Sequence, residues 1–351
     1  MKKKIILQIS VCLVFFSIFS TFTVKSQQKQ FKVVTVAFYN LENLFDTLDT
    51  PDKDDFEYTP EGPNKWDSKK YNTKLERMSE VIAQIGADIT KTAPAVIGVS
   101  EIENRKVLED LINMPLLKPY NFDIVHYESP DKRGVDVALL YQKSILKVEN
   151  TRSATLKMKD LDDFFTRDQL VVSGTIDNEK FHFIVNHWPS RSGGEKVSIP
   201  KRNAAADLTR SLADSIMLTD PNAKIIIMGD LNDDPSNESL LKHLKAKKTV
   251  GDTKPGDLYN AMYDLYLNGI GTLAYRDAWN IFDQLILSYP LINKDETGFK
   301  LYKTKVFDKE FLKNESGMYK GYPKRTHAGG VYQAGYSDHF PVYIILTKEL
   351  K

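Results

Sequence analysis

The sequence predicts an α/β fold in which two packed β-sheets are flanked by helices. Many short runs rich in Val, Ile, Phe and Tyr are separated by turn residues, which is typical of strands. Two longer stretches, 72–89 and 201–217, repeat apolar residues every three or four positions, as helices that cover a sheet do. No internal repeat, low-complexity linker or shift in composition marks a second domain. We therefore expect one large domain.

The expected strands are apolar runs that end at polar residues. The clearest is Ile225–Met228, an unbroken apolar run followed by Gly229 and Asp230, which is the pattern of a central strand covered on both faces. Glycine at its end would let the backbone approach a ligand closely. In chain order the expected strands are Phe31–Tyr39, Pro94–Val99, Phe122–Tyr127, Val135–Tyr141, Asp168–Ile176, Phe181–Asn186, Ile225–Met228, Phe282–Ser288 and Phe340–Leu346. The expected helices are Asn72–Ile89, Lys106–Met114, Lys201–Met217 and one near Glu238–Leu244.

Residues 1–26 are expected to be a cleaved signal peptide. Three lysines precede the apolar stretch Ile5–Phe22, and the tripeptide ending at Ser26 fits a signal peptidase site. The alternative is an uncleaved membrane anchor, but interspersed Ser and Thr residues make the stretch a poor membrane span. We expect residues 27–351 to form a single exported domain, periplasmic or secreted.

Composition limits the chemistry of this domain. Cys12 is the only cysteine and lies in the signal peptide, which excludes disulfides, thiolate metal ligands and a cysteine nucleophile. The chain has a formal charge of +1, and removal of a segment with four lysines and no acid leaves −3. Such a charge provides no global field that attracts nucleic acid, so binding of a polyanion would depend on local clusters.

Polar side chains suited to metals or phosphate recur where the expected strands end. They are Asn40, Glu101, Asn186, His187, Asp230, Asn232, Asp283, Asp338 and His339. Unpaired buried acids and histidines are costly, so their repetition favours convergence on one site at the rim of the sheets. In an extended tip Asp230 and Asn232 would point the same way. Hard oxygen ligands such as Glu101 suit Mg²⁺ or Mn²⁺, and histidines exchange protons near neutral pH.

The motifs FYNLEN, VSE, NHW, GDLN, FDQLIL and SDH, in this order, resemble the endonuclease/exonuclease/phosphatase superfamily of DNase I-like metal-dependent phosphoesterases. The resemblance covers nearly the whole mature chain, from Asn40 to His339. It implies a four-layer α/β/β/α sandwich of two packed, mostly antiparallel sheets flanked by helices, with the active site at the sheet edges.

The resemblance implies a metal site formed by Asn40 and Glu101, with Asp338 completing the metal shell or the network around it. Two departures bear on this site. Ser100 stands where many members carry Gln, and Glu103 lies close enough to Glu101 to compete for the ligand role.

The resemblance also implies the catalytic roles. Asp230 and Asn232 would orient the attacking water and bind the phosphate. His339 would act as a base or stabilise the transition state, held by Asp283. His187 would bind the phosphate and assist the leaving group, although the sequence allows the two histidines to exchange roles.

Arginines near these motifs are candidates for substrate binding. Arg133, Asn186 and Arg191 are expected to contact the substrate, although a turn beside a strand explains Arg133 equally well. Two basic clusters, 191–202 and 303–325, adjoin site motifs and would form a positive rim. Solvated loops are the alternative for both clusters.

Three functions remain open at this level. The first is an exported, Mg²⁺- or Mn²⁺-dependent phosphodiesterase that acts as a nuclease on DNA or RNA. The second keeps the chemistry but acts on a phospholipid headgroup or a small phosphate ester. The third is a non-catalytic binding module, which would carry a broken motif set. We expect a monomer without an obligate protein partner.

Overall fold

The computed structural model describes residues 29–350, except 160, 162 and 296. The expected signal peptide, residues 1–26, lies outside the described residues. Within these ranges, no helix combines the length and apolar character needed to cross a bilayer.

Two large sheets form the centre of the molecule. The first has the strand order β14-β17-β1-β2-β4-β3, and the second β5-β6-β7-β8-β13-β10-β9. The strands of the first sheet are β1 (Phe31–Leu44), β2 (Val96–Ile102), β3 (Phe122–His126), β4 (Asp136–Gln142), β14 (Lys300–Val306) and β17 (Val342–Glu349). Those of the second are β5 (Leu146–Ala154), β6 (Gln169–Ile176), β7 (Glu179–His187), β8 (Lys224–Asp230), β9 (Ala246–Lys247), β10 (Leu258–Asn260) and β13 (Asp283–Ser288).

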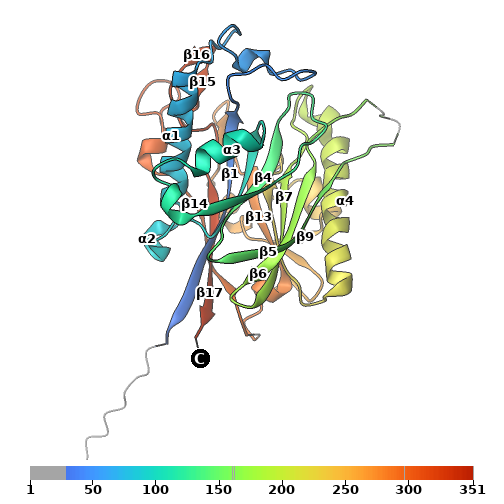
Figure 1. Cartoon of the computed structure of the whole chain (residues 1–351). Coiled ribbons are helices and arrows are strands. Elements are labelled where there is room, and N and C mark those ends of the chain that lie inside the picture. The colour runs from blue at the N-terminus through green and yellow to red at the C-terminus, as the bar shows by residue number, and fades with distance from the viewer. Residues whose placement is uncertain (1–28, 160, 162, 296, 351) are drawn as a thin grey trace, which may run out of the picture.

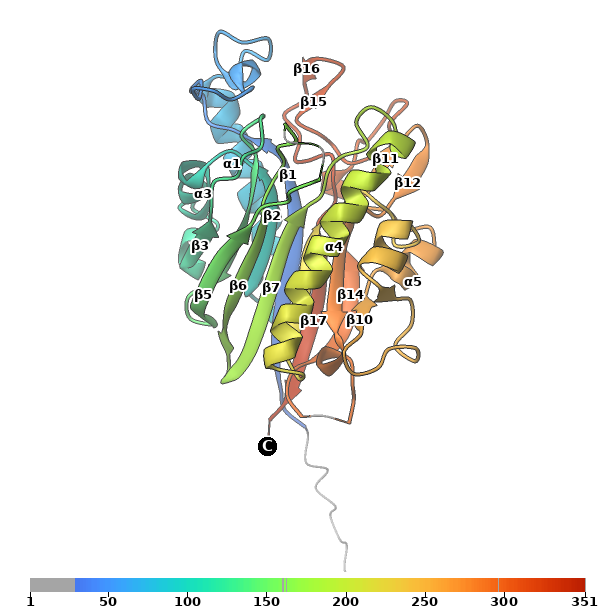
Figure 2. The same cartoon turned by 90° about the vertical axis from the view of Figure 1, so that its right-hand side faces the viewer.

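Helices cover the outer faces of both sheets, which gives the expected four layers (Figure 1). On the first sheet lie α1 (Ser68–Gln84), α2 (Ala87–Thr90) and α3 (Arg105–Ile112). The long helix α4 (Glu195–Thr219) runs along the second sheet, as Figure 2 shows from the side, and α5 (Tyr263–Leu267) is short. Three apolar clusters fill the spaces between successive layers, one between the sheets and one beneath the helices on each side. This burial stabilises the layered fold.

Smaller elements lie in the connections. Two hairpins pair β11 (Leu273–Tyr275) with β12 (Ala278–Asn280) and β15 (His327–Ala328) with β16 (Val331–Tyr332). Single helical turns are Phe56–Tyr58, Lys118–Tyr120, Tyr289–Leu291 and Glu310–Leu312, and the helix expected near 238–244 is a π-helix, Ser239–His243.

The sequence missed the edge strands β5, β9 and β14 and the short strand β10, and it misplaced two helix ends. β5 and β14 are polar and largely solvent-facing, so they lack the apolar run that reveals a central strand. The stretch expected as a solvated loop from residue 303 therefore begins inside β14. Gly86, with φ of 72°, separates α1 from α2 and ends the longer helix that was expected. Helix α4 begins earlier than expected, at Glu195, and contains Pro200 near its start.

The topology gathers the strand ends at one edge. β1 is parallel to β2, and β7 is parallel to β8, so each pair ends on the same side. β13 and β17 are antiparallel to β8 and β1, so β13 begins with Asp283 beside Asp230, the last residue of β8, and β17 begins with Val342 beside Phe38, in the second half of β1. The polar ends of six strands meet there, at the end opposite the C-terminus in Figure 1.

Candidate active site

Asp230 occupies the centre of the polar cluster. The Asn40 amide donates a hydrogen bond to its Oδ2 at 3.1 Å. The same oxygen lies 3.7 Å from His187 Nε2 and 3.9 Å from His339 Nε2. These groups come from β1, β7, β8 and the segment before β17, so both sheets contribute to one site.

The environment of Asp230 makes its carboxylate a good proton acceptor. Burial raises the pKa of Asp230 to about 6, and the negative charges of Asp283 and Glu101 add to this effect. The positive charge of His339 and the Asn232 N–H, which donates to Oδ1 at 3.0 Å, oppose it. A carboxylate with this pKa is ionised at neutral pH yet basic enough to accept a proton from water.

His339 forms a buried pair with Asp283. Nδ1 of His339 lies 2.6 Å from Oδ2 of Asp283, which has no exposed surface. Burial alone would lower the pKa of His339, but Asp283 and Asp230 outweigh it and raise this pKa well above its usual value. Because Asp283 engages Nδ1–H, Nε2 is the nitrogen that faces the site. Ser337 orients the segment, since its hydroxyl donates to the Asn40 carbonyl and accepts the His339 N–H.

His187 has the opposite character. Burial lowers its pKa well below the usual value, and the positive charges of Arg167, Arg133 and His339 reinforce this effect. Its Nε2 lies 3.7 Å from Asp230 and 3.9 Å from Glu101 Oε1, so the neutral ring is expected to carry its proton on Nε2. The neutral ring can therefore donate a hydrogen bond without bringing a positive charge.

The donor set at this edge fits a hard divalent cation. Glu101 receives the Asn43 N–H on Oε2 at 3.1 Å, and Oε1 accepts no hydrogen bond from any described residue. The carboxylates of Asp230 and Asp283 lie close to His339, within a group whose ligand atoms are all within 4.8 Å of one another. Mutual repulsion among these carboxylates is one cause of the raised pKa of Asp230, and a cation would relieve it. Oxygen ligands of this kind suit Mg²⁺ or Mn²⁺.

A family model described as the endonuclease/exonuclease/phosphatase family matches residues 35–348. The chain belongs to this family. Its membership and fold make it a phosphoric ester hydrolase of the DNase I-like type. No curated protein sequence matches the chain.

Solved structures share the fold of this family member. A Bacteroides thetaiotaomicron protein of the same family has 16% identity and a TM-score of 0.55, with 92% of this chain and 100% of that chain covered. A B. thetaiotaomicron mannosyl-6-phosphatase has 16% identity and a TM-score of 0.53, covering 89% and 99%. D. rerio TDP2, in a complex described as containing a single-strand DNA product, has 14% identity and a TM-score of 0.53, covering 90% and 98%.

Several residues of this site have a strained backbone. Four of its non-glycine residues have left-handed backbone angles: Glu42 (φ 49°), Asn43 (55°), Glu101 (57°) and Asn232 (52°). Such conformations cost about 1–3 kcal/mol each and persist only where the surroundings impose them. The tip after β8 is therefore not extended, which corrects the expectation that Asp230 and Asn232 point the same way. The Asn232 amide instead donates to the Trp188 carbonyl at 3.0 Å.

Two expected substrate contacts are corrected. Asn186 is completely buried, and its amide bonds the carbonyls of Ile184 and Met228 and the Trp188 indole. The Arg191 guanidinium donates to the Asn232 carbonyl at 2.9 Å and pairs with acidic residues, including Asp233 at 3.2 Å. Both side chains hold the GDLN tip in place and have little capacity left for a substrate.

Gly229 serves packing within the sheet. A Cβ at this position would lie 2.4 Å from the Asn186 carbonyl oxygen on the neighbouring strand. The expected close approach to a ligand is therefore replaced by a close approach of two strands.

The arginines of both basic clusters are paired with acids, so they add no free positive charge at the site. Arg202 is buried, with Nε 2.7 Å from Asp233. Lys313 pairs with Asp308 and Glu310, and Arg325 pairs with Glu42 and Asp338. Asp308 and Glu310 lie in the same segment as Lys313, whereas the acidic partners of Arg202 and Arg325 come from other segments and are not apparent from the sequence.

The remaining expected residues lie at the edge of the site. Asp338 is about a third exposed and accepts from Arg325 at 2.7 Å, while its other oxygen lies 4.0 Å from His339 Nε2. Arg133 is half-exposed, and its charge acts on His187. Glu103 is turned away from the cluster, because it accepts from Asp46 N and the Thr50 hydroxyl.

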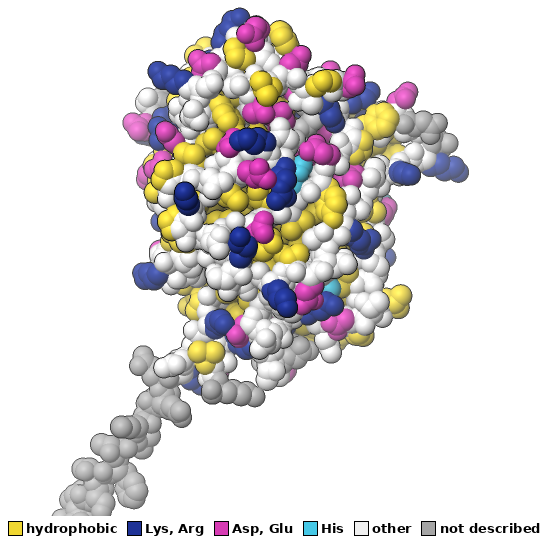
Figure 3. All heavy atoms as spheres, viewed as in Figure 1, with side chains coloured by type: hydrophobic (Ala, Val, Ile, Leu, Met, Phe, Trp, Pro, Cys, Tyr) yellow, Lys and Arg dark blue, Asp and Glu magenta, His cyan; other side chains and the backbone are white. Residues whose placement is uncertain are grey.

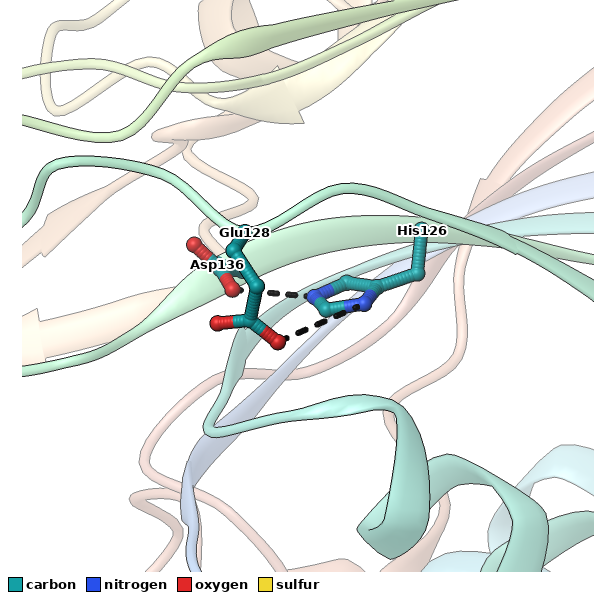
Figure 4. Close-up of side chains that lie close together, drawn as sticks. All are labelled: His126, Glu128 and Asp136. Carbon is teal, nitrogen blue, oxygen red and sulfur yellow. Dashed lines mark hydrogen bonds and ion pairs between the residues drawn. The ribbon is translucent and has the colours of Figure 1, made fainter. Parts of the chain in front are cut away.

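A second histidine and carboxylate group anchors the loop that carries Arg133 (Figure 4). His126 Nε2 lies 2.9 Å from Asp136 Oδ2, and its Nδ1 lies 3.9 Å from Glu128. The other oxygen of Asp136 accepts the Ser129 N–H at 2.9 Å. Both carboxylate oxygens of Asp136 are thus engaged within the loop, which assigns this group a role in holding the loop against β4.

Proposed function

We propose that this phosphoric ester hydrolase is an exported, Mg²⁺-dependent phosphodiesterase. The observation that carries the proposal is Asp230, a carboxylate with a pKa of about 6 placed between two histidines of opposite protonation state. Export is supported by the composition of residues 1–26. Mg²⁺ is supported by the oxygen donors around Glu101.

The chain's own groups account for activation of the attacking water and for stabilisation of the phosphate, while the leaving oxygen departs as an alkoxide or aryloxide that takes its proton from water. Asp230 accepts the proton of the attacking water. The Asn40 amide and the Asn232 N–H hold the Asp230 carboxylate in position and so fix where that water binds. His339, kept protonated by Asp283, donates from Nε2 to a phosphate oxygen and stabilises the charge that develops there. His187 donates a neutral hydrogen bond to the phosphate. A bound divalent ion would supply Lewis-acid stabilisation of the phosphate, held by Glu101 and Asn40.

Two substrate classes are supported by different observations. Nucleic acid is supported by the likeness to TDP2, including the D. rerio protein with a single-strand DNA product. A small phosphate ester is supported by the charge distribution, because Arg191, Arg202 and Arg325 near the site are paired with acids. Figure 3 shows basic and acidic side chains interspersed over the face it presents, without one large basic area.

The test uses the chain from residue 27, stripped of metal, with supercoiled plasmid and with bis(4-nitrophenyl) phosphate, each with and without Mg²⁺ or Mn²⁺. We expect metal-dependent hydrolysis of the aryl ester that Asp230→Ala and His339→Ala abolish. Plasmid nicking with the same dependence would establish a nuclease. Failure to hydrolyse either substrate, or activity unchanged by both substitutions, would overturn the proposal. Mass analysis of the protein from the periplasm and medium tests export, which requires that residues 1–26 are removed.

A further inference from the structure

A cavity of about 290 Å³ opens beside the active site, and we name it the side pocket. Its walls come from the end of β1, the 56–64 loop and the 325–330 segment. The principal lining side chains are Glu42, Asn43, Glu57, Tyr58, Asn64 and Arg325. This volume lies near the lower limit of small-molecule sites, about 300 Å³, and suits a group of roughly one sugar ring.

The side pocket shares a wall with the active site. Each of the three residues expected to bind metal is hydrogen-bonded to a residue that lines the pocket. The bonds run from Asn43 N to Glu101 Oε2 (3.1 Å), from Arg325 Nη2 to Asp338 Oδ2 (2.7 Å) and from Glu42 N to Asn40 Oδ1 (2.8 Å). A group in the pocket would therefore lie next to a phosphate held at the active site.

The charges of the pocket disfavour a second phosphate. The Arg325 guanidinium is already held by Glu42 at 3.3 Å and by Asp338 at 2.7 Å. Lys74 lies behind Glu42, at 3.7 Å, and is completely buried. Glu57 has no ion pair with any residue that the structure describes, and Glu42 is buried, so the exposed charges of the lining are one acid, Glu57, and one arginine that already has two acidic partners. Such a lining offers no free cation to a second phosphate.

The same groups are well suited to hydroxyl groups. The exposed Glu57 carboxylate can accept hydrogen bonds from hydroxyls, and the Asn43 and Asn64 amides can both donate and accept. The pocket wall is also rigid around Tyr58, whose ring stacks on Phe45 with centroids 4.3 Å apart and meets Trp66 edge-on. A rigid wall positions its polar groups before the substrate arrives, which favours specific binding.

We propose that the side pocket binds the uncharged, hydroxyl-bearing part of the substrate, such as a sugar ring, while the active site holds its phosphate. This inference rests on the proposed phosphoester hydrolysis and specifies its substrate class. The sugar could belong to a hexose phosphate or to a nucleotide, since both present hydroxyls beside a phosphate.

The test compares a hexose phosphate and a ribonucleoside monophosphate with 4-nitrophenyl phosphate and bis(4-nitrophenyl) phosphate, which lack hydroxyl groups. Glu57→Ala and Asn64→Ala are expected to raise KM for at least one hydroxylated ester by about tenfold or more, the effect of losing a hydrogen bond to a charged or polar group. Their KM for the aryl esters should stay within about twofold, and kcat should change little. Glu61→Ala, on the same loop but outside the pocket lining, is the matched control.

The outcomes separate this inference from the proposed function. A selective rise in KM supports the pocket, and the ester with the larger rise identifies the sugar. Equal changes for hydroxylated and aryl esters, or hydrolysis of aryl esters alone, would overturn the pocket assignment while leaving the hydrolase intact. Loss of all hydrolysis in the unmodified protein would instead count against the proposed function.

Discussion

Replacing Asp283 with Asn tests the role given to His339. Asp283 is fully buried, and its Oδ2 lies 2.6 Å from His339 Nδ1. Asn keeps the shape and still accepts the Nδ1–H, but it removes the negative charge that raises the pKa of His339. The pair is worth about 4 kcal/mol for charges about 4 Å apart at an effective dielectric constant of about 20. That energy corresponds to a change in rate of about 10³-fold, within the range of about 10²–10⁴-fold that a positioned acid or base contributes to catalysis.

We therefore expect Asp283→Asn to lower kcat at pH 7.5 by about 10²- to 10³-fold, with little change in KM. The raised pKa keeps His339 protonated through neutral pH, so activity should fall only at alkaline pH. In the variant this fall should move to lower pH. The assay is the pH profile of bis(4-nitrophenyl) phosphate hydrolysis at saturating Mg²⁺. The control is Asp207→Asn, an exposed carboxylate 2.9 Å from His243 and remote from the site. An unchanged alkaline limb, or faster hydrolysis at neutral pH, would refute a proton-donating His339.

Three further predictions concern the metal and stability. Glu101→Gln should raise the Mg²⁺ concentration for half-maximal activity by about tenfold or more, whereas Glu103→Gln should leave it unchanged. If the two variants need the same Mg²⁺ concentration, Glu101 is not a metal ligand. Burial raises the pKa of Glu103 to about 7, so the free energy of unfolding should decrease as pH rises from about 4.5 to 7. In urea unfolding, the decrease in the free energy of unfolding between pH 5 and pH 8 should be smaller for Glu103→Gln than for the unmodified protein. An identical decrease in the two proteins would contradict this prediction. Gly229→Ala should lower the free energy of unfolding by about 3 kcal/mol, because its Cβ would meet the Asn186 carbonyl oxygen at 2.4 Å. Gly251→Ala is the control and should change this free energy little, because its Cβ would lie 3.9 Å from Thr249 Oγ1, an ordinary contact; similar urea midpoints for the two variants would refute the packing argument.

Much of the fold could be predicted because buried strands carry their own signal. Runs such as Ile225–Met228 are apolar on both faces, and the structure buries them between layers. Edge strands carry no such signal: β14 alternates Lys with other residues and is held by its hydrogen bonds to β17. Strand existence was therefore predictable for long buried runs, but not for polar edge strands or for a buried strand as short as β10.

The position of the site was predictable for a related reason. Polar residues at the ends of buried strands must be paired or bound, so their repetition indicates convergence at one edge. The sequence does not show which charges pair with one another. Arg191 and Arg202 look like free basic residues beside the NHW motif, yet both bind Asp233, which the GDLN turn brings from another strand. The arginines of the expected basic rim are neutralised by contacts between distant segments, which the sequence does not show.

The clearest contribution of the structure is to distinguish the two histidines, whose roles could be exchanged on sequence alone. Both lie within 4 Å of the same Asp230 oxygen, so that carboxylate does not separate them. Their other neighbours do. Asp283 holds a proton on His339, whereas burial and the arginines around His187 keep that ring neutral. The assignment of donor and neutral partner therefore follows from side chains remote in sequence, and exchanging the roles would require moving Asp283 to the other ring.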